Sequence, residues 1–183
     1  LVGSVARAVV AVSRRPVVLV RSGLRPEDEH RRGAFRSGAT PFRDVVLGLN
    51  SGAPCDTVLE FAFNAASRRA AGLRVVHGRH PELPYYDNGG HLNAELHDEL
   101  VGEAHRVVSE ALEPWRDKYA GVEVTEQAVI GKAGSHLVGA SRDASLVVVG
   151  RRPRRTPAGA AIGPVVDAVL RHATAPVAVV PHD

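Results

Sequence analysis

Short runs of valine and leucine, separated by helical stretches, constrain the fold of this chain more than any other feature. Five such runs occur, over residues 45–49, 73–77, 122–129, 145–149 and 177–180. Nearly continuous valine runs are typical of strands that are buried on both faces of a sheet. The run 122–129 alternates more between apolar and polar residues, and this pattern favours a strand at the edge of the sheet.

Helical patterns occupy the intervals between these runs, over residues 54–71, 93–119, 135–142 and 164–172. Gly72 is expected to stop the first helix, and Pro114 should kink or interrupt the second. Alternation of strands and helices predicts a parallel sheet with right-handed crossovers. We therefore predict an α/β fold with a five-stranded, mostly parallel, doubly wound sheet, Rossmann-like, with helices on both faces. Ligands bind such sheets beyond the carboxyl ends of the strands, where the strand order reverses.

The end of the chain repeats its beginning. Residues 2–21 align with residues 162–181 without a gap, and seven of the twenty pairs are identical. The identical pairs are Gly3/Gly163, Val5/Val165, Ala8/Ala168, Val9/Val169, Pro16/Pro176, Val17/Val177 and Val20/Val180. Such a repeat predicts that residues 1–22 are the last helix and strand of a preceding unit. Residues 23–40 are then a linker and residues 41–183 a complete second unit. The complete lack of methionine agrees with a fragment of a tandem protein.

Composition describes an ordinary globular protein, with 44% hydrophobic and 23% charged residues. A net charge of +3 is too weak to indicate nucleic acid as a partner, and no apolar run is long enough to predict a membrane span. The single cysteine, Cys55, excludes an internal disulfide and fits a reducing compartment, so we expect a cytoplasmic protein. Cys55 itself is interpreted as a small packed residue rather than a reactive thiol.

The loop after the fourth run, residues 150–163, is the most suggestive stretch for function. It combines glycines with four arginines and leads into the amino terminus of a predicted helix. Free N–H groups and the partial positive charge at a helix amino terminus favour phosphate, and guanidinium groups add forked donors. The alternative interpretation is a solvated loop with no ligand. Nucleic acid is less favoured, because the loop carries no aromatic side chain for stacking.

At this loop the chain resembles the universal stress protein family, and the resemblance extends over about residues 41–183. ATP-binding members carry Gly-x-x-Gly, nine residues, and then Gly followed by Ser or Thr. Here Gly150 and Gly163 match the outer glycines, and Gly159 matches a further common position. The resemblance implies an adenine nucleotide alpha hydrolase-like fold, with ATP or another adenine nucleotide as a possible ligand. The binding residues that it implies are Asn50, Gly52, Val76, Gly150, Arg151, Arg152, Gly159 and Gly163.

Three residues depart from the pattern of the ATP-binding members. Pro153 replaces the second glycine, and Pro164 replaces the hydroxyl residue and removes an amide donor. Asn50 stands where those members carry an aspartate just after the first strand, so the charge is lost. The first copy keeps Gly3-Ser4 at the corresponding place. We therefore hypothesise that the preceding unit binds nucleotide and that this unit has lost or altered that ability.

No catalytic machinery is recognisable in the sequence. The histidines lack metal-ligand spacing, and no nucleophile elbow, P-loop lysine or paired carboxylates occur. The leading hypothesis is a non-enzymatic, stress-associated regulatory or dimerisation protein with a degenerate phosphate loop. The alternative is an ATP-binding sensor or weak ATPase that uses the same loop.

The family often pairs through its last strand, which corresponds here to Val177–Val180. Residues 17–20 of the first copy match this strand. The two segments are therefore predicted to pair antiparallel and to imitate the dimer within one chain. A homodimer through the same strand is the other arrangement that the resemblance allows.

Overall fold

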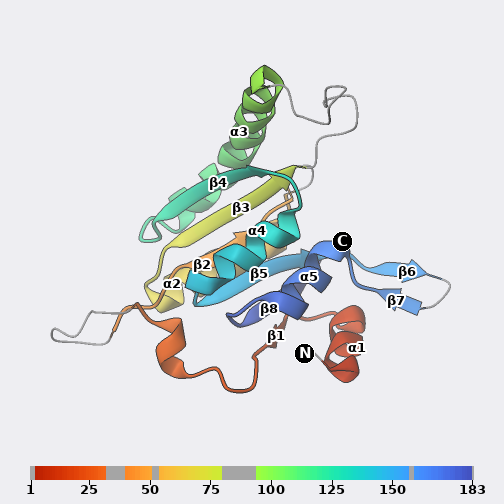
Figure 1. Cartoon of the computed structure of the whole chain (residues 1–183). Coiled ribbons are helices and arrows are strands. Elements are labelled where there is room, and N and C mark those ends of the chain that lie inside the picture. The colour runs from red at the N-terminus through yellow and green to blue at the C-terminus, as the bar shows by residue number, and fades with distance from the viewer. Residues whose placement is uncertain (1–2, 32–39, 51–53, 80–93, 157–158, 183) are drawn as a thin grey trace.

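A six-stranded sheet forms the centre of the protein, in the order β1-β8-β5-β2-β3-β4 (Figure 1). The computed structural model describes residues 3–31, 40–50, 54–79, 94–156 and 159–182. The strands are β1 (Val17–Leu19), β2 (Val45–Gly48), β3 (Leu73–Arg79), β4 (Val124–Ile130), β5 (Leu146–Arg151) and β8 (Val177–Pro181). The last five of these run parallel to one another, and β1 joins the edge of β8 antiparallel.

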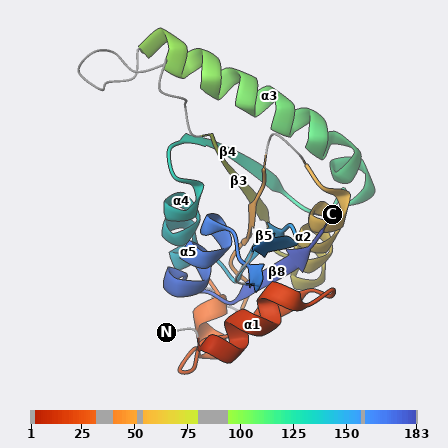
Figure 2. The ribbon, with the colours of Figure 1, turned by 90° about the vertical axis from the view of Figure 1, so that its right-hand side faces the viewer.

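Helices cover both faces of the sheet (Figure 2). They are α1 (Ser4–Val12), α2 (Asp56–Arg69), α3 (Ala94–Lys118), α4 (Ala133–Ala140) and α5 (Pro164–His172). α2 and α3 pack on one face, and α1, α4 and α5 pack on the other. Within the described connections lie the short 3-10 helices η1 (Pro26–Glu29) and η3 (Ser141–Asp143). The predicted doubly wound α/β fold is thus confirmed, with β1 as an additional sixth strand.

Two apolar cores result from the alternation of side chains along the central strands. Val45 and Leu47 of β2 contribute to the core under α2 and α3, whereas Val46 contributes to the core under α4 and α5. All three side chains are fully buried. Successive residues of a strand point to opposite faces, so a continuous apolar run requires helices on both sides. The valine runs therefore dictate the layered architecture.

Several details differ from the sequence-based prediction. α3 continues through Pro114 to Lys118 without interruption, because Trp115 and Tyr119 pack onto the core beneath the helix. The left-handed residue that ends α2 is Ala70, with φ 46°, rather than Gly72. Gly72 serves close packing instead, since a Cβ there would lie 2.9 Å from Oδ1 of Asp44.

Residues 150–163 were predicted to be a loop, but part of this segment after β5 is regular. It contains a two-stranded antiparallel hairpin of β6 (Arg154–Thr156) and β7 (Gly159–Ala161). The run 122–129, in contrast, became β4 at the edge of the sheet, as its alternation predicted. Within the parts of the chain that the structure describes, no helix combines the length and apolarity that a membrane crossing requires.

Phe63 packs against the aromatic side chains at the carboxyl end of α3 and links this end of the helix to the core. Its ring is fully buried, with centroids 6.0 Å from Trp115 and 5.5 Å from Tyr119. We expect Phe63→Ala to lower the free energy of unfolding by about 3–5 kcal/mol, because it leaves a cavity and removes two aromatic contacts. Urea titration followed by Trp115 fluorescence measures this loss. Val12→Ala, at an exposed position of α1, is the control and should change stability by less than about 0.5 kcal/mol. A loss below about 1 kcal/mol for Phe63→Ala would contradict this account.

Candidate functional site

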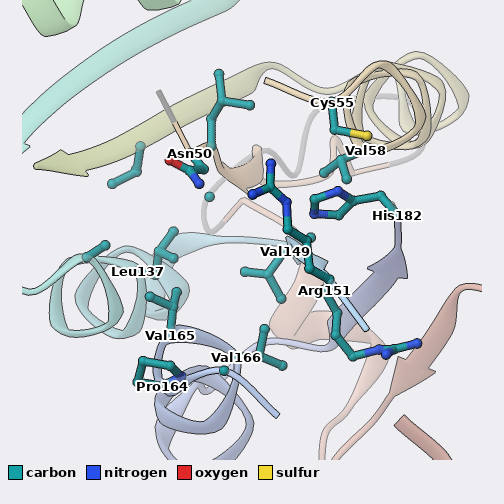
Figure 3. A pocket seen from close by; sticks show the side chains of 17 residues that line it. Asn50, Cys55, Val58, Leu137, Val149, Arg151, Pro164, Val165, Val166 and His182 are labelled. Carbon is teal, nitrogen blue, oxygen red and sulfur yellow. The ribbon is translucent and has the colours of Figure 1, made fainter. Parts of the chain in front are cut away.

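A cavity of about 370 Å³ opens at the carboxyl ends of β2 and β5 (Figure 3). The sheet order reverses there, because β2 is followed by β3 on one side and adjoins β5 on the other. Parallel sheets bind ligands at this topological point, as the sequence analysis anticipated. The described residues that line the cavity are Gly48, Leu49, Asn50, Cys55, Val58, Val76, Ala133, Leu137, Val149, Gly150, Arg151, Arg152, Gly163, Pro164, Val165, Val166 and His182.

The end of β2 supplies one wall of the cavity. The amide of Leu49 donates to the carbonyl of Val76 at 3.0 Å, which holds the chain in register as it leaves the sheet. Asn50 follows, exposed and directed toward the cavity (Figure 3). Gly48 allows Leu137 of α4 to approach, since a Cβ at this position would lie 2.7 Å from the Cδ1 atom of Leu137.

The amino terminus of α5 supplies the opposite wall. Gly163 is the N-cap residue and Pro164 the first residue of the helix. Because proline has no N–H, the amides of Val165 and Val166 are the donors that this first turn directs outward before the helix ladder begins. Both residues line the cavity. The wall therefore retains the favourable end of the helix dipole but has one amide donor fewer than a helix without proline.

His182 covers the first glycine of the loop and was not identified from the sequence. A Cβ on Gly150 would lie 2.8 Å from Nε2 of His182 and 3.1 Å from Cγ2 of Val58, so a larger residue here would require the ring to move. The amide of His182 donates to the carbonyl of Arg151 at 3.0 Å, which extends the β5–β8 pairing to the cavity. Its position in the sequence could have indicated this role, because His182 directly follows β8, and β8 is the neighbour of β5 in the sheet.

Arg151 lines the cavity, but its guanidinium group is engaged elsewhere. The side chain is 4% exposed and its Nη2 donates to the carbonyl of Ser13, the residue that caps the carboxyl end of α1. Figure 3 shows the side chain running away from Asn50. Arg151 thus contributes its backbone and the stem of its side chain to the cavity, and its charge to the N-terminal segment. Arg152, next along the chain, is exposed.

The structure brings together six of the eight residues that were predicted to bind a nucleotide. These are Asn50, Val76, Gly150, Arg151, Arg152 and Gly163. Gly52 lies outside the described residues. Gly159 lies in β7, paired with Thr156 across the hairpin. The lining residues that sequence reasoning missed include Cys55, Val58, Leu137 and His182, which approach the cavity only through the tertiary fold.

A second surface with functional potential is the edge of β8, which the N-terminal segment covers. β1 pairs antiparallel with β8, and Val10 of α1 is buried in the same core as Leu170 of α5. The side chains of Arg7 and Asp167 form an ion pair between the two helices. We call this surface the final-strand face; it consists of β8 and α5 with the residues of α1 and β1 packed against them.

Apart from the cavity and the final-strand face, a buried polar group lies between the sheet and α3. His77 of β3 is 1% exposed and neither ring nitrogen has a partner among the described residues. Desolvation lowers the pKa of His77, the Glu126 carboxylate partly offsets this, and His105 adds to the lowering. Glu126 pairs with Arg116, and its second oxygen lies 3.2 Å from Nδ1 of His105 without hydrogen-bond alignment. His77 is therefore neutral in the folded protein near neutral pH.

The fold and the position of the cavity define a doubly wound α/β protein with a cavity where the strand order reverses. Comparison with known proteins identifies the family. The model of the universal stress protein family matches residues 41–181, and the chain belongs to this family. The universal stress protein Rv2005c of Mycobacterium tuberculosis is 29% identical over 98% of this chain and 56% of its own length. The chain spans about half the length of the curated relatives that it matches.

Solved structures share the fold. A universal stress protein from Archaeoglobus fulgidus superposes with a TM-score of 0.62 at 18% identity, over 100% of this chain and 57% of its own. A universal stress protein crystallised in complex with cAMP superposes with a TM-score of 0.50 at 21% identity, over 79% of this chain and 100% of its own. These structures agree in the layered α/β architecture.

The buried, neutral His77 makes stability depend on pH. Its pKa is lower in the folded than in the unfolded state, so the unfolded chain binds more protons and the free energy of unfolding falls as pH decreases below about 6.5. We expect this decrease, at most about 1.4 kcal/mol per pH unit, to be smaller in His77→Leu than in the wild type. Urea titrations at pH 8, 7, 6 and 5 measure it. His136→Leu, at an exposed position of α4, is the matched control. Parallel pH profiles for the wild type and His77→Leu would contradict the assignment.

Proposed function

We propose that this chain is the paired second unit of a tandem universal stress protein and acts as a non-enzymatic, stress-associated regulatory module. In this proposal residues 1–22 end a preceding unit, residues 23–40 link the units, and residues 41–183 form the second unit. The observation that carries the proposal is the pairing of β1 with β8 within one chain. The single, half-buried Cys55 supports a reducing compartment, the cytoplasm, as the place of action.

The register of the β1–β8 pair supports an imitation of a dimer. The offset of 160 positions relates the two copies of the repeat, and the same offset maps the ladder onto itself. The pairs are Val17 with Val179, Val18 with Ala178, and Leu19 with Val177. An exchange of the copies leaves this set unchanged, which is the property of an isologous two-fold interface. We infer that the final-strand face serves pairing between two units.

Exposed apolar side chains on the N-terminal segment support a preceding unit. Val18 and Val20 are 50% and 63% exposed, whereas their counterparts in the second copy, Ala178 and Val180, are fully buried. Val9 is likewise exposed, and its counterpart Val169 is buried. Exposed apolar side chains on both β1 and α1 indicate surfaces that another element can cover. Because each counterpart packs against the sheet and helices of its own unit, we infer that the corresponding elements of a first unit cover this surface.

The lining of the cavity favours binding over hydrolysis. Among its described residues there is no carboxylate, and the titratable side chains are those of Cys55, Arg151, Arg152 and His182. Hydrolysis of a phosphoanhydride requires a group that orients or activates water, and such a group is commonly a carboxylate or glutamine. The walls offer amide donors and apolar surface, which suit a small ligand with an anionic group.

An adenine nucleotide is the second candidate function, favoured by the helix amino terminus in the cavity wall. The relative crystallised with cAMP shows that one protein of this fold holds a nucleotide with a single phosphate. Pro164 has no amide N–H to donate to a phosphate, and the guanidinium group of Arg151 is bound to the carbonyl of Ser13. Both features reduce the number of donors available to a triphosphate. We therefore propose weak affinity for ATP, with a preceding unit as the stronger nucleotide binder.

A cross-link tests the pairing. In a Cys55→Ser background, we expect Val18→Cys/Ala178→Cys to form a disulfide within one chain under mild oxidation. Directly opposed residues of antiparallel strands have Cα atoms about 4.5–5.5 Å apart, within the range of a disulfide. Non-reducing electrophoresis and mass spectrometry of peptides measure the product. Val20→Cys/Ala178→Cys, in the same background, is the control and should cross-link more slowly because these residues are not opposed. The pairing proposal fails if no intrachain product forms.

Nucleotide titration tests the cavity. We expect calorimetry to show weak ATP binding by the wild type, and the double substitution Pro153→Gly/Pro164→Ser to raise the affinity about tenfold, because it restores two amide donors and a hydroxyl group. Titration with cAMP in parallel separates the contribution of a single phosphate. Pro26→Ala in η1, remote from the cavity, is the control. Tight ATP binding by the wild type, unchanged by the double substitution, would contradict the proposed weakening.

A further inference from the structure

The ion pair between α1 and α5 lies on the same local two-fold axis as the centre of the β1–β8 ladder. Val18 faces Ala178, and these residues are counterparts in the repeat. Arg7 and Asp167 are also counterparts, separated by 160 positions, and their side chains contact each other. A residue that contacts its own counterpart lies on the two-fold axis of an isologous interface. The axis therefore passes between Val18 and Ala178 in the sheet and between Arg7 and Asp167 in the helices.

We propose that the opposite charges of Arg7 and Asp167 make the final-strand face selective for the preceding unit and against a second copy of the complete unit. This inference rests on the pairing proposed above and adds the choice of partner. In a pairing of two second units, the axis would place Asp167 against Asp167. In a pairing of two first units, it would place Arg7 against Arg7. Only the mixed pairing places opposite charges on the axis.

The surroundings of the axis determine how strong this preference is. The two side chains are about one-third exposed, so water screens their interaction only in part. Burial opposes ionisation of Asp167, but hydrogen bonds from Arg7 and Arg171 outweigh it and hold the pKa of the carboxyl below its ordinary value. Arg171, bound to Asp167 at 2.9 Å, would relieve part of the repulsion between two second units. Its counterpart in the first copy is Ala11, so two first units would have no such relief.

Arg21 supplies an independent, one-sided contact. Its Nη2 donates to the carbonyls of Leu170 at 3.0 Å and Arg171 at 2.6 Å, in the last turn of α5. A cation at a helix carboxyl end satisfies open carbonyls and favours the helix dipole. The counterpart of Arg21 is Pro181, which has no side-chain donor. A second copy of the complete unit could not reproduce this contact.

Arg151 makes the reciprocal contact in the other direction, through the carbonyl of Ser13 at the carboxyl end of α1. The counterpart of Ser13 is Ala173, whose carbonyl is chemically equivalent. This contact would therefore form both in the mixed pairing and in a pairing of two second units. The Arg7–Asp167 and Arg21 contacts would form only in the mixed pairing. Among the described residues, two of these three polar side-chain contacts across the face thus discriminate between partners. Specific interfaces commonly combine such attraction for one partner with repulsion of another.

Charge reversal in the cross-linking background tests the proposal. The parent chain carries Cys55→Ser, Val18→Cys and Ala178→Cys, and the variants add Arg7→Asp, Asp167→Arg, or both. We expect each single reversal to slow intrachain disulfide formation about tenfold, and the double reversal to restore the parent rate. A parent chain that does not cross-link refutes the pairing itself. A parent that cross-links at a rate unaffected by either reversal refutes only the selectivity.

Mixing the two single variants provides a second readout, which does not depend on the rate within one chain. One variant carries aspartate at positions 7 and 167 and the other carries arginine at both, so only exchange of N-terminal segments makes both pairs complementary. After equimolar co-refolding and oxidation, we expect at least about tenfold more interchain dimer than either variant forms alone. Raising NaCl from 0.05 to 1 M should reduce this excess.

The matched control reverses charges in a pair remote from the final-strand face. Arg106 and Glu110 form an exposed ion pair in α3 at 3.3 Å, four residues apart. Arg106→Asp and Glu110→Arg, in the same cysteine background, should leave the intrachain rate within about twofold of the parent and give no excess of interchain dimer. An equal excess of dimer from these control variants would overturn the proposal.

Discussion

Burial of the central strands on both faces is the constraint on which the rest of the structure depends. The side chains of β2 alternate between two apolar cores, so helices must cover both sides of the sheet. Crossover connections then carry the chain outward from β2 in both directions, and the carboxyl ends of β2 and β5 meet where the order reverses. The cavity, the amino terminus of α5 and the edge of β8 all take their positions from this arrangement.

The cavity and the final-strand face are physically connected through the end of β5. Gly150 lies beneath His182, and the next residue, Arg151, extends its side chain to the carboxyl end of α1. A residue that resemblance assigns to nucleotide binding therefore holds the N-terminal segment. The chain belongs to the universal stress protein family, and in the function proposed above this end of β5 serves pairing more than the capture of a triphosphate.

Much of the fold could be predicted because its signal is local and repetitive. The valine runs indicated every strand of the parallel sheet, and the alternation in 122–129 indicated the edge position of β4. The hairpin β6–β7 escaped prediction because its short strands carry no apolar periodicity. α3 passes through Pro114 because packing on Phe63 outweighs the lost backbone hydrogen bond, a tertiary effect that no local pattern contains. The direction of Arg151 and the approach of His182 likewise depend on contacts between distant segments.

The connection between β1 and β2 has a consequence for how pairing responds to protein abundance. β1 ends at Leu19 and β2 begins at Val45, so the covalent connection over residues 20–44 tethers the N-terminal segment to the unit whose β8 edge it covers. Tethered partners meet at an effective concentration that is commonly in the millimolar range, whatever the number of molecules in the cell. A pair joined in this way neither dissociates on dilution nor forms in proportion to expression. Its occupancy depends on the equilibrium within one chain and not on the amount of protein.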